Sequence, residues 1–302
     1  MSPTEPVVFP PALVDTHVHI LSADQDRFPL RPTGLGRPWW SEPGRDAKAL
    51  LSVMDEKGVG RAIAAQAVGP YGYDNTYLLH AVSVHPDRLA AVPAIDVDDR
   101  TIDDDALAAS ITSLDPSRGV VGVRLMGIAP GSSWAHDEAR ARVAFHAAHR
   151  VGLVVVLTVW PDQLQVLTKV IQEGPDVQIA LDHCAFPELV GGLVPAGAPL
   201  LALQPAENVG LKVSSHLLRE AASGGDPAGL VAQLAETFGS ERLLWGSDYP
   251  QTDGDYDALL RDAAEAAGGL GGEAQAAFFA GNATRTFFAG RPDFSRASER
   301  GS

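Results

Sequence analysis

Short apolar runs rich in β-branched residues recur along the whole chain, and this recurrence constrains the fold more than any other feature of the sequence. Helical patterns fill the intervals, and three of them run into a glycine, at Gly58, Gly152 and Gly174, as helix C-termini commonly do. Continuous apolar runs are typical of strands that are buried on both faces of a parallel sheet. We predict eight strands, at 12–20, 61–67, 89–96, 120–126, 153–160, 177–183, 209–215 and 242–248.

Eight strands that alternate with helices over roughly 280 residues are the pattern of a closed barrel. We therefore predict an α/β protein with a (β/α)₈ TIM barrel, built as a single domain over residues 1–302, with the barrel itself at about 12–288. An open doubly wound sheet is the alternative architecture. It is disfavoured because no G-x-G-x-x-G motif follows an early strand.

A long segment, 21–44, follows the first predicted strand and is rich in Pro, Gly and aromatic residues. A loop of this length is usually functional or disordered, and after the first strand of a barrel it would lie over the active-site face. Phe28, Trp39 and Trp40 then either wall a pocket or pack the loop onto the barrel. At the other end of the chain we expect the tail 291–302 to be frayed.

The chain carries a formal net charge of −15, and no cluster of Lys or Arg stands out. We therefore expect neither nucleic acid nor a membrane as a partner, although a local Arg still permits an anionic substrate. The single cysteine, Cys184, rules out an intramolecular disulfide and fits a reducing compartment. Residues 1–14 lack the features of a signal peptide, and no apolar run approaches the ~18 residues of a membrane helix, so we expect a cytoplasmic protein.

The first predicted strand contains "DTHVHI", in which Asp15, His17 and His19 are spaced two apart. Residues two apart in a strand face the same side, so we expect these three side chains to project together into the barrel. The C-terminal ends of barrel strands are where such barrels place their active sites. A buried, hydrogen-bonded histidine pair is the alternative. The in-phase aspartate favours a functional pair.

Two other strand ends bring matching groups, His183 in "LDHCAF" and Asp248 in "WGSDYP". The first and last strands of a barrel are neighbours, so Asp248 should approach His17 and His19. This set of two nitrogens and one oxygen suits a divalent metal, with zinc as the best candidate. Alternatively, Asp248 acts as a general base on water. A third alternative is that Asp248 caps the N-terminus of a helix, although neighbouring Ser247 can take that role and leave Asp248 free. Asp182 is expected to face away from His183 or to cap the following turn.

These motifs, together with "GNATRTFF" near the end, resemble the amidohydrolase superfamily, and in particular its amidohydrolase-related branch, from about residue 12 to 288. The lactonase-like members, pyrone dicarboxylate lactonase and fuconolactonase-like enzymes, are the most similar. The resemblance implies that His17 and His19 form the first-strand pair and that His183 polarises a substrate carbonyl or contacts the attacking water. It also implies that Asp248 takes a proton from water.

The sequence departs from this pattern in the fifth predicted strand. Metal-dependent decarboxylases of the branch have a histidine ligand at the end of this strand, where this chain has Thr158, Val159 and Trp160. A metal would have His17, His19 and Asp248 as ligands, with His183 as an additional one. The departure therefore gives weight to the resemblance to lactonases that work without bound metal, in which the histidines bind the ester carbonyl and Asp248 alone activates water. Such a mechanism requires a good leaving group, which a lactone provides.

Four further residues are expected to contact the substrate: Arg124, Gln66, Tyr73 and Tyr249. Arg124 is predicted to bind a substrate carboxylate, because a buried arginine in a barrel strand needs an anion. A salt bridge to Asp15 is the alternative. The remaining groups are weaker candidates: His216, Lys212, which points into the barrel or to the surface, and Cys184, expected on the opposite face from its neighbour His183.

We therefore predict a hydrolase that opens a small lactone or cyclic ester, with an anionic, carboxylate-bearing small molecule as substrate. A metal-dependent non-oxidative decarboxylase, a lactone isomerase and a ligand-binding barrel without turnover are the alternatives. The sequence leaves open whether the chain forms a homo-oligomer.

Overall fold

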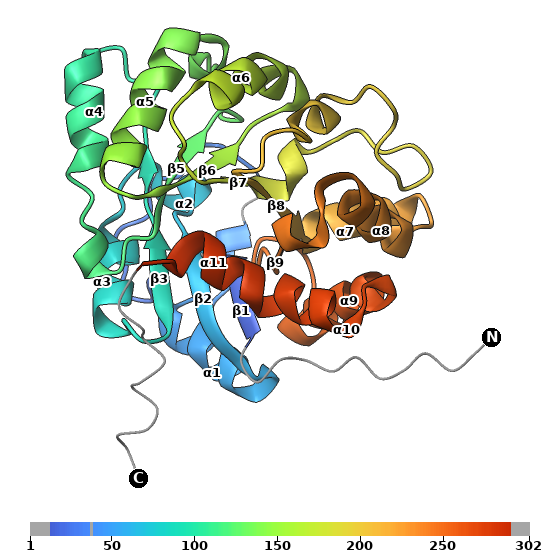
Figure 1. The fold of residues 1–302 in the computed structure, drawn as a ribbon. Helices are drawn as coiled ribbons and strands as arrows, with labels where there is room; N and C mark the ends of the chain where they lie inside the picture. Colours follow the sequence, from blue (N-terminus) through green and yellow to red (C-terminus); the bar gives the residue numbers. More distant parts are fainter. Residues whose placement is uncertain (1–12, 37–38, 291–302) are drawn as a thin grey trace.

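The computed structural model describes residues 13–36 and 39–290, and the predicted tail 291–302 lies outside these ranges. All paired strands run parallel and form the centre of the molecule, with helices around them (Figure 1). The strands are β1 (Leu13–Val18), β2 (Val59–Ala65), β3 (Leu89–Val92), β4 (Ala94–Ile95), β5 (Gly122–Met126), β6 (Val154–Thr158), β7 (Ile179–Leu181), β8 (Val209–Ser214) and β9 (Leu243–Gly246).

The strands form a closed ring of eight. β3 and β4 are two parts of one barrel strand, since only Pro93, which has no N–H, separates them, and its carbonyl still accepts from the N–H of Arg124. Two parallel bridges, Ala91 with Val120 and Val18 with Tyr249, join the sheet β1–β2–β3 to the sheet β4–β9 at both edges. The prediction of a (β/α)₈ barrel is confirmed, with strands within the predicted ranges apart from the start of β2.

Helices follow most of the strands and pack against the outside of the ring (Figure 1). Aspartate side chains cap several of them, as Asp46 does by accepting from the N–H of Ala49, and α1 ends at Gly58, as predicted, with this glycine in the left-handed conformation. None of the helices in the described ranges combines the length and the apolar character that crossing a membrane requires. The helices are α1 (Ala47–Lys57), α2 (Val68–Tyr71), α3 (Thr76–Val84), α4 (Asp104–Thr112), α5 (Glu138–Arg150), α6 (Pro161–Glu173), α7 (Ser215–Ser223), α8 (Pro227–Phe238), α9 (Tyr256–Ala266), α10 (Gly272–Ala276) and α11 (Asn282–Phe288).

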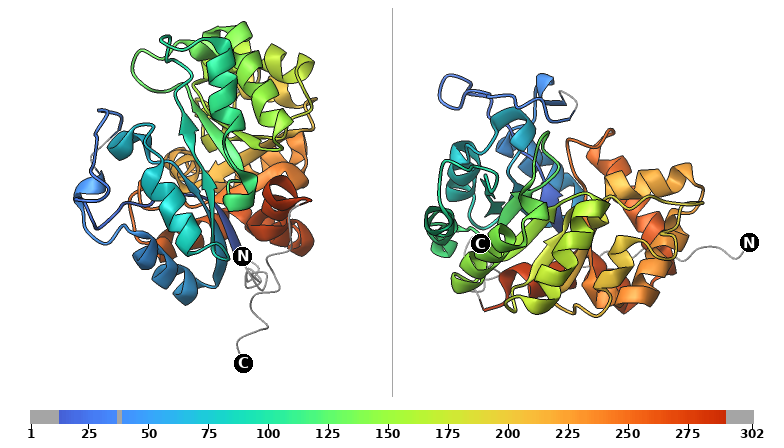
Figure 2. Two further views of the ribbon diagram at one scale, coloured as in Figure 1. Left: turned by 90° about the vertical axis from the view of Figure 1, so that its left-hand side faces the viewer. Right: turned by 90° about the horizontal axis from the view of Figure 1, so that it is seen from above.

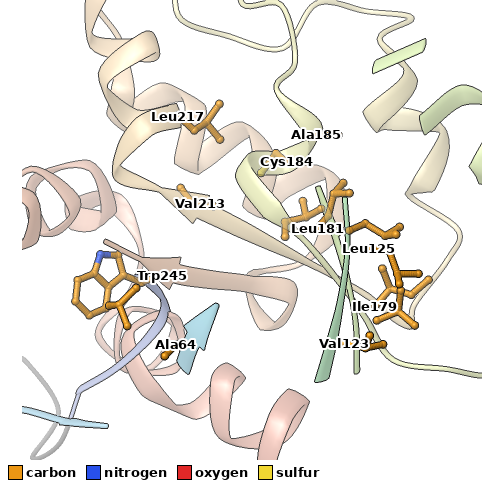
Figure 3. Close-up of a cluster of buried hydrophobic side chains, with 14 of the residues drawn as sticks. Ala64, Val123, Leu125, Ile179, Leu181, Cys184, Ala185, Val213, Leu217 and Trp245 are labelled. Atoms are coloured by element: carbon orange, nitrogen blue, oxygen red, sulfur yellow. The ribbon is translucent and has the colours of Figure 1, made fainter. Parts of the chain in front are cut away.

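The core has two parts, because alternate residues of each strand face opposite sides. Outward side chains such as Leu181, Val213 and Trp245 pack in the large cluster between strands and helices (Figure 3). Inward side chains form a second cluster in the barrel lumen, which Phe287 of α11 joins. Above this apolar floor the inward positions become polar, and these positions carry the candidate site.

The alternation is interrupted once, in β1. Val14 belongs to the lumen cluster, whereas the Asp15 carboxylate accepts from the hydroxyl of Tyr256 on α9 at 2.7 Å. The pairing of β1 with β2 shifts between Asp15 and Val18, which inserts one extra residue and returns His17 to the lumen. The expectation that Asp15 projects with the two histidines was therefore wrong. Its carboxylate instead joins β1 to the N–H of Ser247 at 2.9 Å.

The segment after β1 projects at the edge of the molecule (Figure 2) and bonds to α2 through its backbone. Its aromatic residues divide between the two expected roles. Phe28 is buried against Tyr77, with ring centroids 5.2 Å apart, so it anchors the loop. Trp39 lies over His19 at a centroid distance of 5.8 Å and lines a cavity that Asp248 also lines.

Candidate active site

His17, His19 and Asp248 meet at the C-terminal ends of β1 and β9. The Nε2 atoms of the two histidines are 3.2 Å apart, and each lies 3.5 Å from Oδ1 of Asp248. All three residues are almost completely buried. The structure thus brings together the residues that the sequence assigned to a common site.

Hydrogen bonds on the far side of each ring set the positions of the histidine protons. Nδ1 of His17 lies 3.1 Å from Oδ1 of Asp182, and Nδ1 of His19 lies 2.9 Å from the carbonyl of Ala65. Carboxylate and carbonyl oxygens only accept, so both Nδ1 atoms carry the hydrogen and both Nε2 atoms present lone pairs. Two lone pairs that face each other at 3.2 Å repel unless a cation or a proton lies between them.

Asp248 presents an unpaired oxygen to these two nitrogens. Its backbone, at φ 55°, lies in the left-handed region, and its N–H donates to the carbonyl of His17 at 2.8 Å. Oδ2 accepts from the hydroxyl of Thr252 at 2.7 Å, while the buried Oδ1 has no hydrogen-bond partner among the described residues. The Ser247 hydroxyl accepts from the N–H of Tyr249, which leaves the carboxylate of Asp248 free for chemistry.

His183 completes the cluster from the end of β7. Nδ1 of His183 lies 2.7 Å from the hydroxyl of Ser214. One ligand atom each from His17, His183 and Asp248 lie within 4.8 Å of one another, which is a spacing that fits a metal ion. The buried unpaired oxygen of Asp248 and the two lone pairs on neutral imidazoles are the donor set that a divalent cation requires. The residues therefore fit a divalent metal.

Asp182 lies beneath His17 and was missed by the sequence reasoning. Its Oδ1 contacts Lys212 Nζ at 3.0 Å in addition to His17, and its Oδ2 accepts from Thr158 at 2.7 Å and Arg124 at 3.2 Å. The prediction that Asp182 faces away or caps a turn was wrong. Ala180 and Asp182 follow the inward alternation. His183 also reaches the site because four consecutive residues, 183–186, have φ between 48° and 58°.

These contacts determine which groups are charged. Burial lowers the pKa of His17 to about 3 and that of His183 to about 4, although Asp182 and Asp248 oppose the effect, so both rings are neutral at physiological pH. Burial would raise the pKa of Asp248, but its interactions with His19, His183 and His17 outweigh burial and hold the pKa below its usual range. Burial acts in the same way on Asp182, where His17, Lys212 and Arg124 outweigh it and hold the pKa well below the usual range.

The predicted substrate contacts have different positions. Arg124 lines the cavity but is bonded to Asp182, to the Thr158 hydroxyl at 3.0 Å and to the carbonyl of Gln66 at 2.9 Å; the expected partner Asp15 is not among these contacts. The side-chain amide of Gln66 donates to two backbone carbonyls. Tyr73 packs beside Met126, and Tyr249 packs against Tyr256.

A cavity of about 820 Å³ opens above the site. Arg124, Thr158, His183 and Asp248 lie among its lining, and Trp160, Phe186 and His216 also line it. His216, a weak candidate from sequence, has its ring 5.5 Å from that of His183. Lys212, whose direction the sequence left open, points into the barrel. Cys184 is buried in the outer cluster (Figure 3), where burial raises the pKa of its thiol.

Comparison with known proteins places this chain in a family. The family model described as Amidohydrolase matches residues 14–289. The chain belongs to the amidohydrolase family, and it is an enzyme of the hydrolase class. An L-fucono-1,5-lactonase from Burkholderia ambifaria is 29% identical over 291 residues, which cover 92% of this chain and 96% of the relative.

Solved structures share the fold. A probable 2-pyrone-4,6-dicarboxylic acid hydrolase from Acinetobacter baumannii, with citric acid bound, superposes with a TM-score of 0.72 at 20% identity, covering 91% of this chain and 98% of that one. An amidohydrolase from Burkholderia multivorans with bound zinc gives a TM-score of 0.68 at 19% identity, covering 91% and 99%.

Proposed function

We propose that this protein is a lactonase that opens a small cyclic ester by attack of water, with Asp248 as general base. The observation that carries the proposal is the buried Oδ1 of Asp248, a residue that lines the cavity, because this oxygen has no hydrogen-bond partner among the described residues. The carboxylate is ionised and can accept a proton from water. The similarity to a relative named as an L-fucono-1,5-lactonase supports the same reaction class.

The histidines take one of two roles in this proposal. They either bind the ester carbonyl oxygen directly or bind a divalent metal, most suitably zinc, through His17, His19 and His183 with Asp248. When bound, a divalent cation polarises the carbonyl oxygen and makes water more acidic. In both cases the water oxygen bonds to the acyl carbon while Asp248 receives a proton from that water. The ring C–O bond then breaks, and the departing oxygen takes from Asp248 the proton that Asp248 received from water.

A lactone fits the site better than the substrates of the alternative reactions. The fifth barrel strand, β6, ends at Thr158, whose hydroxyl bonds to Asp182 and Arg124 where a decarboxylase of this branch would have a histidine. A metal here therefore lacks one ligand of the decarboxylase set. An activated ester needs less assistance to its leaving group than an amide. Lactone opening is accordingly preferred over decarboxylation.

Asp248→Asn tests this proposal. The purified enzyme should open lactones in a pH-indicator screen, and Asp248→Asn should lower kcat by roughly 10²–10⁴-fold because it removes the base. Metal content should be measured before and after dialysis against a chelator, and again after zinc is restored. A loss of activity that zinc reverses would assign the histidines to the metal.

Asp105→Asn is the matched control, because Asp105 is exposed in the first turn of α4. It should retain the full rate and the same metal content. An Asp248→Asn enzyme with most of its activity would refute the role of Asp248 as base. Release of carbon dioxide from an aromatic acid, without turnover of any lactone, would favour the decarboxylase.

A further inference from the structure

We propose that the substrate is an uncharged lactone with an apolar substituent, in place of the carboxylate-bearing substrate that the sequence predicted. The inference rests on the proposed lactonase function and specifies its substrate class. Three properties of the cavity support it: the hydrogen bonds that already occupy Arg124, the apolar character of one wall, and an aromatic pair at the rim that includes the exposed Trp160.

The cavity offers little to a carboxylate. Among the described residues that line it, Arg124 is the only Lys or Arg, and Asp182, Thr158 and the carbonyl of Gln66 all accept hydrogen bonds from its guanidinium. The Asp182 carboxylate, which lies 3.2 Å from Arg124 and is shared with Lys212, weakens the positive field that an anion would need. The other charged residues of the described lining are acidic, namely Glu188, Glu220 and Asp248, and these carboxylates disfavour an anionic substrate.

One wall of the cavity is made of aliphatic side chains. Val68 and Met126 form a small buried cluster with Ala94, and Leu35 and Ile128 pack against this cluster. Four of these five residues, all except Ala94, line the cavity. A polyhydroxylated ring pressed against this wall would lose hydrogen bonds to water without replacement, which is costly. An alkyl group there would gain from removal of apolar surface from water.

The rim carries an aromatic pair made of the exposed Trp160 and the half-buried Phe186. Trp160, at the start of α6, is 43% exposed, although tryptophan is among the residues that are highly buried on average. Its ring lies 5.0 Å from that of Phe186, and Phe186 in turn lies 4.8 Å from His183. This chain of rings leads from solvent to the reactive cluster. An apolar substituent on the lactone can therefore bury the exposed face of Trp160 while the ester reaches His183.

A matched set of δ-lactones tests the substrate class. The set contains the unsubstituted ring, rings with alkyl chains of increasing length, the same chain ending in a carboxylate, and a hexose 1,5-lactone. We expect kcat/KM to rise roughly fourfold for each buried methylene, and the carboxylate-terminated lactone to fall at least tenfold below its alkyl counterpart. A higher kcat/KM for the carboxylate or the hexose lactone than for the alkyl lactones would overturn the inference.

Substitutions of Trp160 test whether the rim of the cavity contacts the apolar substituent of the lactone. Trp160→Ala should lower the ratio of kcat/KM for alkylated over unsubstituted lactone about fivefold, while Trp160→Phe should keep most of that ratio. Val84→Ala is the control, since Val84 is exposed on α3 and lines none of the cavities around the site. An unchanged ratio in Trp160→Ala would show that the rim does not contact the substituent and would contradict the inference.

A binding measurement separates this inference from the proposed function. δ-Lactams with the same substituents are not hydrolysed readily, and calorimetry on the wild-type enzyme measures their affinity without turnover. Tighter binding of the alkyl lactam than of its carboxylate counterpart supports the substrate class, even if the enzyme opens no lactone. Failure to open any lactone would refute only the proposed lactonase reaction. Tighter binding of the carboxylate lactam would refute the substrate class.

Discussion

Asp182 links four polar side chains from four strands of the barrel. Burial of a carboxylate is costly, and here it is offset by Lys212, Arg124, Thr158 and the Nδ1–H of His17. The contact with His17 also fixes the tautomer that directs a lone pair at the candidate metal position. One buried carboxylate therefore acts both on stability and on the geometry of the reactive cluster.

We predict that Asp182→Asn destabilises the protein by about 3–5 kcal/mol, because it leaves buried cations without their anionic partner. It should also weaken metal affinity by about 10–100-fold through the loss of His17 orientation. Urea unfolding and metal titration measure the two effects. Adding Lys212→Met to Asp182→Asn should recover part of the lost stability. If the free energies of unfolding of the two substitutions are strictly additive in this double-mutant cycle, the energetic coupling between Asp182 and Lys212 is refuted.

The sequence predicted the residues that stand at the ends of strands, but not those whose backbone departs from strand geometry. His17, His19 and Asp248 could be brought together by strand order alone. Asp182 was placed on the wrong side because the left-handed backbone at His183 cannot be inferred from residue types that rarely adopt it. Because Asp182 was placed on the wrong side, the alternative of a salt bridge from Arg124 inside the barrel named Asp15, whereas the observed partner is Asp182.

At the scale of elements, the site depends on close contact between β1 and β9, where the barrel closes. Gly246 makes this contact possible, because a Cβ at this position would lie 2.8 Å from Cβ of His17. The extra residue in β1 turns His17 into the lumen directly opposite this glycine. The position of His17 and the closure of the barrel are thus set by the same pair of strands.

Gly246→Ala should therefore displace β1, with a loss of about 1–3 kcal/mol in stability. A shift of His17 approaching 1 Å should lower kcat/KM by as much as ~10²-fold. Thermal unfolding and lactone kinetics measure both effects. The control is Gly268→Ala, where an added Cβ meets nothing within 4 Å and the backbone is not left-handed. Equal behaviour of the two variants would show that the β1–β9 contact is not tight.

The elements themselves were predicted well because periodicity reports burial directly. Eight apolar runs gave eight barrel strands, and even the split at Pro93 fell inside a predicted run. The extra residue in β1 could not be predicted, because the apolar pattern of "ALVDTHVHI" does not reveal where a one-residue insertion shifts the strand register. Asp15 was assigned to the lumen for that reason.

The whole molecule is strongly acidic, with a formal net charge of −15. A field of this sign repels anions during their approach, in addition to the local repulsion by acidic side chains of the cavity. The global and the local charge therefore favour the same class of ligand. An uncharged molecule experiences neither effect.

We predict that ionic strength separates the two ligand classes. Raising it from roughly 10 mM to roughly 150 mM shortens the Debye length from about 30 Å to about 8 Å. The kcat/KM for a carboxylate-bearing lactone should then rise severalfold, while that for an alkyl lactone of equal size should change less than about twofold. Initial-rate kinetics in potassium chloride measure this, and equal responses of both lactones would show that the net charge does not influence encounter.

The left-handed turn from His183 to Phe186 has a consequence for recombination between related barrels. A strand that ends in an ordinary turn delivers one side chain to the lumen at its last position, whereas this turn delivers both Asp182 and His183. Four consecutive non-glycine residues in this conformation tolerate few exchanges one at a time. The end of β7 and its turn are therefore a module that must be inherited or transplanted as a single block.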